Sequence, residues 1–177
     1  MATNLSKKEE LLLKDQKSHE EVCIEKYTNY AEQAQDPELK QLFNQYLSQE
    51  EQHLNTLNQI MSGQVPNLQA QQGGQSGQQG QQSQQSGQNQ NSQQSGQNQQ
   101  YGMQSSKSTG MVDQSDIELC KDVLMTEKYV SNTYDTAIFE FRDTNIRNAL
   151  NHIQKEEQQH GEGVFNYMYS KGMYNVE

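Results

Sequence analysis

Apolar residues recur every three to four positions along three stretches of the chain, and polar residues fill the positions between them. Such a period places the apolar side chains on one face of an α-helix. The sequence therefore predicts amphipathic helices over these stretches. Their apolar stripes consist of Leu12, Leu13, Cys23, Ile24, Tyr27, Tyr30, Ala31 and Ala34; of Leu39, Leu42, Phe43, Tyr46, Leu57, Ile60 and Met61; and of Ile146, Ala149, Leu150, Ile153, Val164, Tyr167 and Met168.

Helix-capping residues bound these stripes and indicate a fourth helix. Residues 6–9, Ser-Lys-Lys-Glu, read as a capping box, and residues 115–118, Ser-Asp-Ile-Glu, read as a second one that would open a helix. Asp36, which precedes a proline, and Asp143 suit helix N-termini, and Gly63 suits a helix end. Four helices and no strand pattern predict an all-α fold made of two helical hairpins.

The middle of the chain has a different composition from both ends. Gln makes up 17 of the 32 residues from 69 to 100, and Gly, Ser and Asn make up most of the others. Such a segment cannot bury enough apolar surface to offset the entropy of ordering it, so we expect a disordered Gln/Gly/Ser-rich linker over residues 63–112. The hairpins would occupy residues 1–62 and 113–177 and together form one bundle.

Composition argues against several classes of function. The formal net charge is -10, so we expect no nucleic-acid partner, because such proteins need a basic surface for the phosphates. No apolar run approaches the roughly 20 residues that cross a bilayer, and residues 1–10 lack the pattern of a signal peptide. We therefore expect synthesis in the cytoplasm and no membrane insertion. Cys23 and Cys120 fall on predicted apolar stripes, which favours buried, reduced thiols over a redox or cross-linking role.

The two hairpins match each other when the sequence is shifted by 107 positions. Residues 12–61 then align without a gap with residues 119–168 and are identical at 11 of 50 positions. Duplication of one helical hairpin explains this register. The identical pairs include Lys14 with Lys121, Asp15 with Asp122, Glu20 with Glu127, Tyr27 with Tyr134, Asp36 with Asp143, Glu50 with Glu157, and His53 with His160.

Three of these pairs have the residue types of a metal site. Residues 50–53 and 157–160 both read E-x-x-H, which places a carboxylate and an imidazole about one turn apart on one helix face. One Glu from each of two helices and an E-x-x-H from each of the other two form the ligand set of a two-metal site in a helical bundle. The predicted metal ligands are Glu20, Glu50, His53, Glu127, Glu157 and His160.

The spacing of the four glutamates allows them to meet. In each hairpin the turn, at Asp36 or Asp143, lies midway between the two glutamates. Residues equidistant from a hairpin turn lie at the same height, here about 22 Å from it. A single E-x-x-H on a polar helix is usually solvated surface, but two copies in register with two matched glutamates favour a buried site. Buried carboxylates must be paired, protonated or bound to metal.

Other polar residues near the predicted ligands have more ordinary interpretations. Glu21, Glu51 and Glu156 fall off the core face and are expected in solvent. His19 and His152 have no counterpart in the other hairpin and are expected at the surface.

Two tyrosines and two glycines also lie close to the predicted site. Tyr27 and Tyr134 could hydrogen-bond the ligand carboxylates, or serve as ordinary core tyrosines. Gly161 and Gly163 weaken the last helix, whereas the first hairpin has Leu and Thr at these positions. This divergence suggests relaxed constraint beside one ligand.

The six predicted ligands form a pattern that resembles the ferritin-like superfamily, in particular the rubrerythrins and manganese catalases. The resemblance implies a ferritin-like four-helix bundle with two Fe or Mn ions. Carboxylate-rich ligation by nitrogen and oxygen also suits Fe and Mn better than Zn or Cu. The rubredoxin-like iron module of rubrerythrins has no counterpart, because the chain has no pair of cysteines to form it.

The second hairpin resembles the spore coat F family of endospore-forming bacteria. The matching segments are residues 122–129 (DVLMTEKY), 142–150 (RDTNIRNAL) and 167–174 (YMYSKGMY). The resemblance implies a ferritin-like helical domain in the spore coat, usually treated as structural. Its partners would be other spore coat proteins, with a homo-oligomer as a further possibility.

The leading hypothesis is therefore a structural spore coat protein with a di-metal carboxylate site. The alternative is a di-iron or di-manganese peroxidase or catalase that protects the spore from peroxide, for which no catalytic residue is assigned. Iron storage in a cage is less favoured, because the polar insert offers no cage contact. Attachment to the coat could use the Gln tract or oxidative coupling of Tyr167, Tyr169 and Tyr174, against the simpler readings of a passive spacer and helix-end packing.

Overall fold

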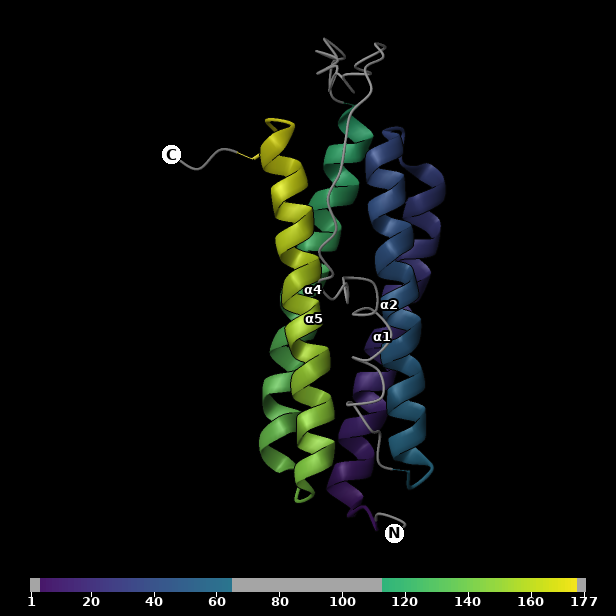
Figure 1. Cartoon of the computed structure of the whole chain (residues 1–177), viewed down its shortest axis with the longest axis vertical. Helices are drawn as coiled ribbons and strands as arrows, with labels where there is room; N and C mark the ends of the chain where they lie inside the picture. Colours follow the sequence, from purple (N-terminus) through teal and green to yellow (C-terminus); the bar gives the residue numbers. More distant parts are fainter. Residues whose placement is uncertain (1–3, 65–112, 175–177) are drawn as a thin grey trace, which may run out of the picture. The chain divides into compact units, whose positions relative to one another are not determined.

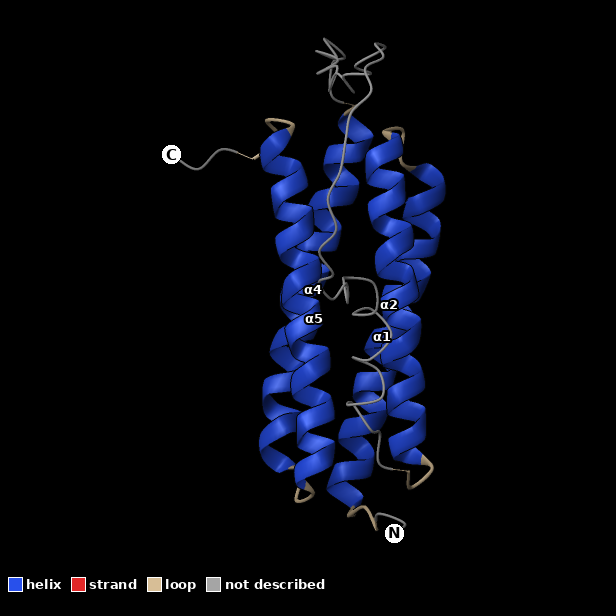
Figure 2. Ribbon diagram, viewed as in Figure 1, coloured by secondary structure: helices blue, strands red, loops and turns tan. Residues whose placement is uncertain are grey.

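The computed structural model describes residues 4–64 and 113–174, and every regular element within them is an α-helix (Figure 2). The prediction of an all-α fold with two helical hairpins is confirmed. The predicted linker lies, from residue 65 onward, outside the described residues. The helices are α1 (Lys7–Gln33), α2 (Pro37–Met61), α4 (Gln114–Glu140) and α5 (Thr144–Ser170).

Three of the four predicted helix starts are confirmed. The capping box of residues 6–9 forms at the start of α1, and Asp36 and Asp143 cap α2 and α5. The prediction of a second capping box at residues 115–118 is wrong. Asp113 caps α4 instead, because its Oδ1 accepts a hydrogen bond of 2.7 Å from the backbone amide two residues later.

Each hairpin ends on a glycine in the left-handed region. Gly63 after α2 has φ 84°, and Gly172 after α5 has φ 71°. Residues with a Cβ rarely adopt these angles, so the helix-ending role predicted for Gly63 is confirmed.

The four helices run up, down, down and up within one compact unit (Figure 1). α1 packs against α2 and α4, and α5 packs against α4 and α2. The end of α2 and the start of α4 therefore lie at opposite ends of the bundle, roughly 40 Å apart at 1.5 Å per residue.

A matched pair of carboxylates joins each hairpin's turn to the start of the other hairpin. Asp116 in α4 accepts hydrogen bonds from the backbone amides of Gln35 and Asp36, at 2.8 and 2.9 Å. Glu9 in α1 accepts one from the backbone amide of Arg142, at 2.9 Å. Glu9 and Asp116 are also 107 positions apart. They provide hydrogen-bond partners for backbone amides of the turns, and they hold α1 antiparallel to α4.

The core runs along the bundle as one stripe from each helix. In α1 the buried positions recur at the spacing of a helix face and comprise Glu9, Leu13, Gln16, Glu20, Cys23, Tyr27 and Ala31. Cys23 and Cys120 are buried and unpaired. Burial raises the pKa of Cys120 to about 12, so this thiol is unreactive at neutral pH. In the part of the chain that the structure describes, no helix is both apolar enough and long enough to span a bilayer.

Candidate metal centre

All six residues predicted as metal ligands lie together in the middle of the bundle. They occupy core positions of their helices, at the three- and four-residue spacing of the apolar side chains around them. None of the six is more than 2% exposed. One glutamate comes from α1, one from α4, and an E-x-x-H pair from each of α2 and α5.

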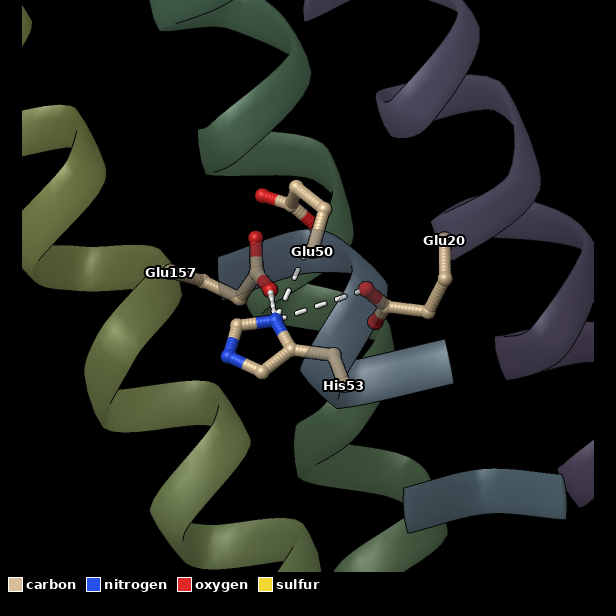
Figure 3. Close-up of side chains that lie close together, drawn as sticks. All are labelled: Glu20, Glu50, His53 and Glu157. Atoms are coloured by element: carbon tan, nitrogen blue, oxygen red, sulfur yellow. Dashed lines mark ion pairs between the residues drawn. The ribbon is translucent and has the colours of Figure 1, made fainter. Parts of the chain in front are cut away.

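The first group of side chains surrounds Nδ1 of His53 (Figure 3). This nitrogen lies 2.9 Å from Oε1 of Glu157, 3.5 Å from Oε2 of Glu20 and 3.6 Å from Oε2 of Glu50. One donor atom from each of the four residues lies within 4.8 Å of the others. Four donors at this spacing can surround a single cation.

The second group is built in the same way around His160. Its Nδ1 lies 2.9 Å from Oε1 of Glu50 and 3.8 Å from Oε2 of Glu127. Glu157 completes the group, and its four donor atoms again lie within 4.8 Å of one another.

Glu50 and Glu157 belong to both groups. Each carboxylate has two oxygens and can offer one to each position, so the site has the form of two adjacent cation positions joined by two shared carboxylates. The separate donors are Glu20 with His53 at one position and Glu127 with the second histidine at the other.

Several buried polar atoms of the six residues are left without partners. Eight buried side-chain atoms of the six residues have no hydrogen-bond partner, including both oxygens of Glu50 and of Glu157. The approaches of the histidine nitrogens to carboxylates are close but lack hydrogen-bond geometry. Buried polar atoms are nearly always satisfied in native proteins, and two divalent cations would satisfy all eight.

The electrostatics of the cluster also favour cations. Burial raises the pKa of Glu157 to about 7 and that of Glu50 and Glu127 well above 4.5, with neighbouring glutamates adding to the effect. Burial would also raise the pKa of Glu20, but contact with His53 outweighs it and lowers this pKa. Without a cation, burial and mutual repulsion therefore favour protonation of the three carboxylates whose pKa is raised.

Two buried tyrosines hold the outer glutamates across the interface between the hairpins. The hydroxyl of Tyr27 in α1 donates a hydrogen bond to Oε1 of Glu127 in α4, and that of Tyr134 in α4 donates one to Oε1 of Glu20 in α1. Each bond leaves Oε2 of its glutamate for the centre. Of the two interpretations open from the sequence, the tyrosines therefore contact the carboxylates directly.

The outer nitrogens of the two histidines have different partners. Nε2 of His53 lies 2.9 Å from Oε2 of Glu156, whereas Nε2 of His160 lies 3.3 Å from Oε1 of Gln49. With Nδ1 facing the site, Nε2 carries the proton and donates it to these oxygens. The prediction that Glu156 is solvent-exposed is wrong: it is half-buried and also contacts His152 at 3.4 Å.

The two histidines also have opposite pKa shifts. Burial would lower the pKa of His53, but contacts with Glu156 and Glu157 raise it well above 6.5. Burial lowers the pKa of His160 to about 4. Since Gln49 and Glu156 are 107 positions apart, one substitution between equivalent positions makes the two sides of the site unequal.

The remaining neighbours lie largely as the sequence indicates. Glu21 and Glu51 are exposed. His19 is partly exposed, and its ring meets the edge of the Tyr129 ring with centroids 5.4 Å apart.

Gly163 does not reflect relaxed constraint. A Cβ at this position would lie 1.7 Å from the hydroxyl oxygen of Tyr46, whose ring packs on His160 with centroids 4.3 Å apart. The equivalent residues of the other pair are Ile153 and Thr56. The repeat therefore has a larger residue at one of these positions, Tyr46 against Ile153, and a smaller one at the other, Gly163 against Thr56. These size differences in the repeat alignment are the sequence signal that could have revealed the packing of Tyr46 against Gly163.

A comparison with protein families places the second hairpin in context. The family model of the Coat F domain matches residues 115–177, which contain α4 and α5. No curated protein and no solved structure matches the chain. The Coat F match supports the resemblance of the second hairpin to the spore coat F family, and it covers the helices that carry Glu127, Glu157 and His160.

Proposed function

We propose that this chain is a structural protein of the spore coat whose helical bundle binds two divalent metal ions. The Coat F match supports the coat assignment. The observation that carries the metal assignment is the pair of four-residue groups sharing Glu50 and Glu157. Chance burial of acidic residues would not give each group its own glutamate and histidine in matched positions.

The bundle belongs, on this proposal, to the ferritin-like superfamily. Three features support it: the up-down-down-up order of the helices, the placement of the end of α2 and the start of α4 at opposite ends of the bundle, and the position of each donor on its helix. The bound ions are Fe or Mn, because six carboxylate and imidazole donors without a thiolate suit these metals.

Metal analysis tests the proposal directly. Protein purified without chelator, and dialysed against Fe(II) or Mn(II), should hold close to two ions per chain. The double variant Glu50→Gln with Glu157→Gln should hold none, because both cation positions lose their shared oxygens. The matched control is Glu51→Gln, an exposed neighbour on the same helix, which should still hold two. Wild-type protein that stays metal-free would overturn the metal assignment and leave the structural one.

Surface features support a role in assembly. Five of the six exposed large apolar side chains among the described residues lie on the adjacent helices α1 and α4. These five side chains offer apolar contacts to a partner protein. They are Leu11, Val22, Met125, Tyr129 and Phe139.

The structure also narrows the chemistry available for cross-linking. Tyr167 is buried, and its hydroxyl donates a hydrogen bond of 2.9 Å to Asp36, so it is unsuited to oxidative coupling. Tyr169 is 57% exposed and is the better candidate. The protein should be enriched in the coat fraction of mature spores. Recovery as a freely soluble protein of vegetative cells would overturn the coat assignment.

A peroxidase or catalase is the second candidate function. Each cation position has four protein residues, fewer than the six donors that Fe and Mn commonly take, so positions remain for a small ligand. On the structural proposal, peroxide consumption is far below that of a dedicated catalase. Rapid consumption that is lost in both His53→Ala and His160→Ala would favour the enzyme.

A further inference from the structure

A groove of about 760 Å³ lies between α4 and α5 and leads inward to the metal-site residues. Its inner wall includes Glu127 and Glu157, and its outer part includes Lys128, Asp135 and Glu162. A water molecule occupies roughly 30 Å³ of liquid, so the groove has room for a hydrated ion. Glu127 and Glu157 therefore belong both to the buried cluster and to the lining of the groove.

Gly161 gives the groove its depth. A Cβ built at this glycine lies 3.6 Å from Cβ of Glu127 and 3.8 Å from Cδ1 of Leu124. Any longer side chain would start against Glu127 and extend along the inner wall. The equivalent position in the first hairpin, 107 residues earlier, is Leu54, which is half-buried. The second hairpin therefore lacks a side chain that the first one has.

The charge of the lining suits a cation. Four carboxylates line the groove, at Glu127, Asp135, Glu157 and Glu162, against the single ammonium group of Lys128. Asp135 and Glu162 are exposed, so they present negative charge where an ion would enter. A concave surface lined by one sign of charge attracts the opposite ion and repels the like one.

We propose that divalent cations enter and leave the centre through this groove, past Gly161. The inference rests on the proposed metal site and adds the side of the bundle from which ions reach it. Glu127 and Glu157, which form the inner wall, would be the first donors to meet the incoming ion. On this proposal, the side chain of Leu54 blocks the corresponding entry in the first hairpin.

The rate of metal loading tests the route. Metal-free protein is mixed with Mn(II), and bound metal is measured over time after rapid desalting. Gly161→Leu should load at least tenfold more slowly and still reach two ions per chain. Gly161→Ala is the matched control and should load at nearly the wild-type rate, because its Cβ makes ordinary contacts. Leu54→Gly, added to Gly161→Leu, should restore fast loading by opening the other side.

Charge variants provide an independent measurement. Asp135→Asn with Glu162→Gln should slow loading several-fold at low ionic strength, and the difference from wild type should shrink in salt. Both residues are exposed, so these changes should leave folding intact even if Gly161→Leu does not fold. Wild-type loading rates in both the Gly161→Leu and the charge variants, with two ions bound, would overturn the route while leaving the metal site in place. Absence of bound metal in wild-type protein would instead overturn the proposed function.

Discussion

Replacement of Gly163 by alanine adds one methyl group at a tightly packed point of the bundle. The new Cβ would lie 1.7 Å from the hydroxyl oxygen of Tyr46 and 2.9 Å from its Cζ. Ordinary contact needs about 3.4 Å or more, so the phenol must move by more than 1 Å. Its ring is held between His160, with centroids 4.3 Å apart, and Tyr27, at 5.8 Å.

The expected cost follows from two opposing effects. Overpacking of this kind costs about 1–3 kcal/mol, and replacement of a helical glycine by alanine gains about 1 kcal/mol. Gly163→Ala should therefore lower the free energy of unfolding by up to about 2 kcal/mol. Gly161→Ala gains the higher helix propensity of alanine without a clash, because its Cβ contacts are 3.6 and 3.8 Å. It should raise the free energy of unfolding by about 0.5–1 kcal/mol.

Urea denaturation in the presence of chelator measures both variants without a contribution from metal. The two alanine variants should differ by about 1–3 kcal/mol, or several degrees in Tm. Tyr46→Phe removes the atom nearest the new methyl group, so it should recover much of the loss when added to Gly163→Ala. Equal stability of Gly161→Ala and Gly163→Ala would refute the packing of Tyr46 against the glycine.

Three further predictions concern acidic residues. Burial raises the pKa of Glu157 from 4.5 to about 7, so the metal-free folded state holds a proton that the unfolded state releases. The free energy of unfolding of the metal-free protein should fall by on the order of 3 kcal/mol as the pH rises from 4.5 to 7. Glu157→Gln should reduce this dependence of stability on pH, as measured by urea denaturation at several pH values. Glu156→Gln should weaken the cation position at His53 about tenfold; unchanged affinity in a metal titration would contradict the role of that contact. Glu9→Gln should cost about 1–2 kcal/mol at pH 7, because Glu9 accepts charge-assisted bonds from Arg142. Contact with Arg142, working against burial, lowers the pKa of Glu9 to about 2. The stabilisation by the Glu9 carboxylate should therefore be lost as the pH falls from 4.5 through 2. If Glu9→Gln is still less stable than wild type at that pH, the assigned role of the charged contact is wrong.

Local rules were sufficient to predict the helices, since each depends on neighbours in the sequence. The apolar period, the carboxylate caps at Asp36 and Asp143, and the glycine at position 63 all act within one or two turns. The error at residues 115–118 is also local, because Asp113, two residues before Ser115, has a side-chain oxygen that accepts the capping bond instead. The periodicity also placed all six candidate ligands on core faces, where the structure brings them together.

What the sequence could not predict depends on contacts between helices. Glu156 falls off the apolar stripe of its own helix but reaches His53 on α2, and Asp116 reaches the turn before α2. No spacing within one helix encodes such pairs. The fit of Tyr46 over Gly163 depends on the separation of α2 and α5, which sequence periodicity does not set.

The donors of each cation position come from both hairpins, so the complete site can form only when the two hairpins are packed together. The position at His53 needs Glu157 from the second hairpin, and the position at His160 needs Glu50 from the first. Neither hairpin can assemble either position alone. If the proposed ions bind, a chain cut between its hairpins should therefore retain them only while the two fragments stay associated. Bound metal would strengthen that association by its own binding energy, so that chelation would favour separation of the cut halves and excess metal would oppose it.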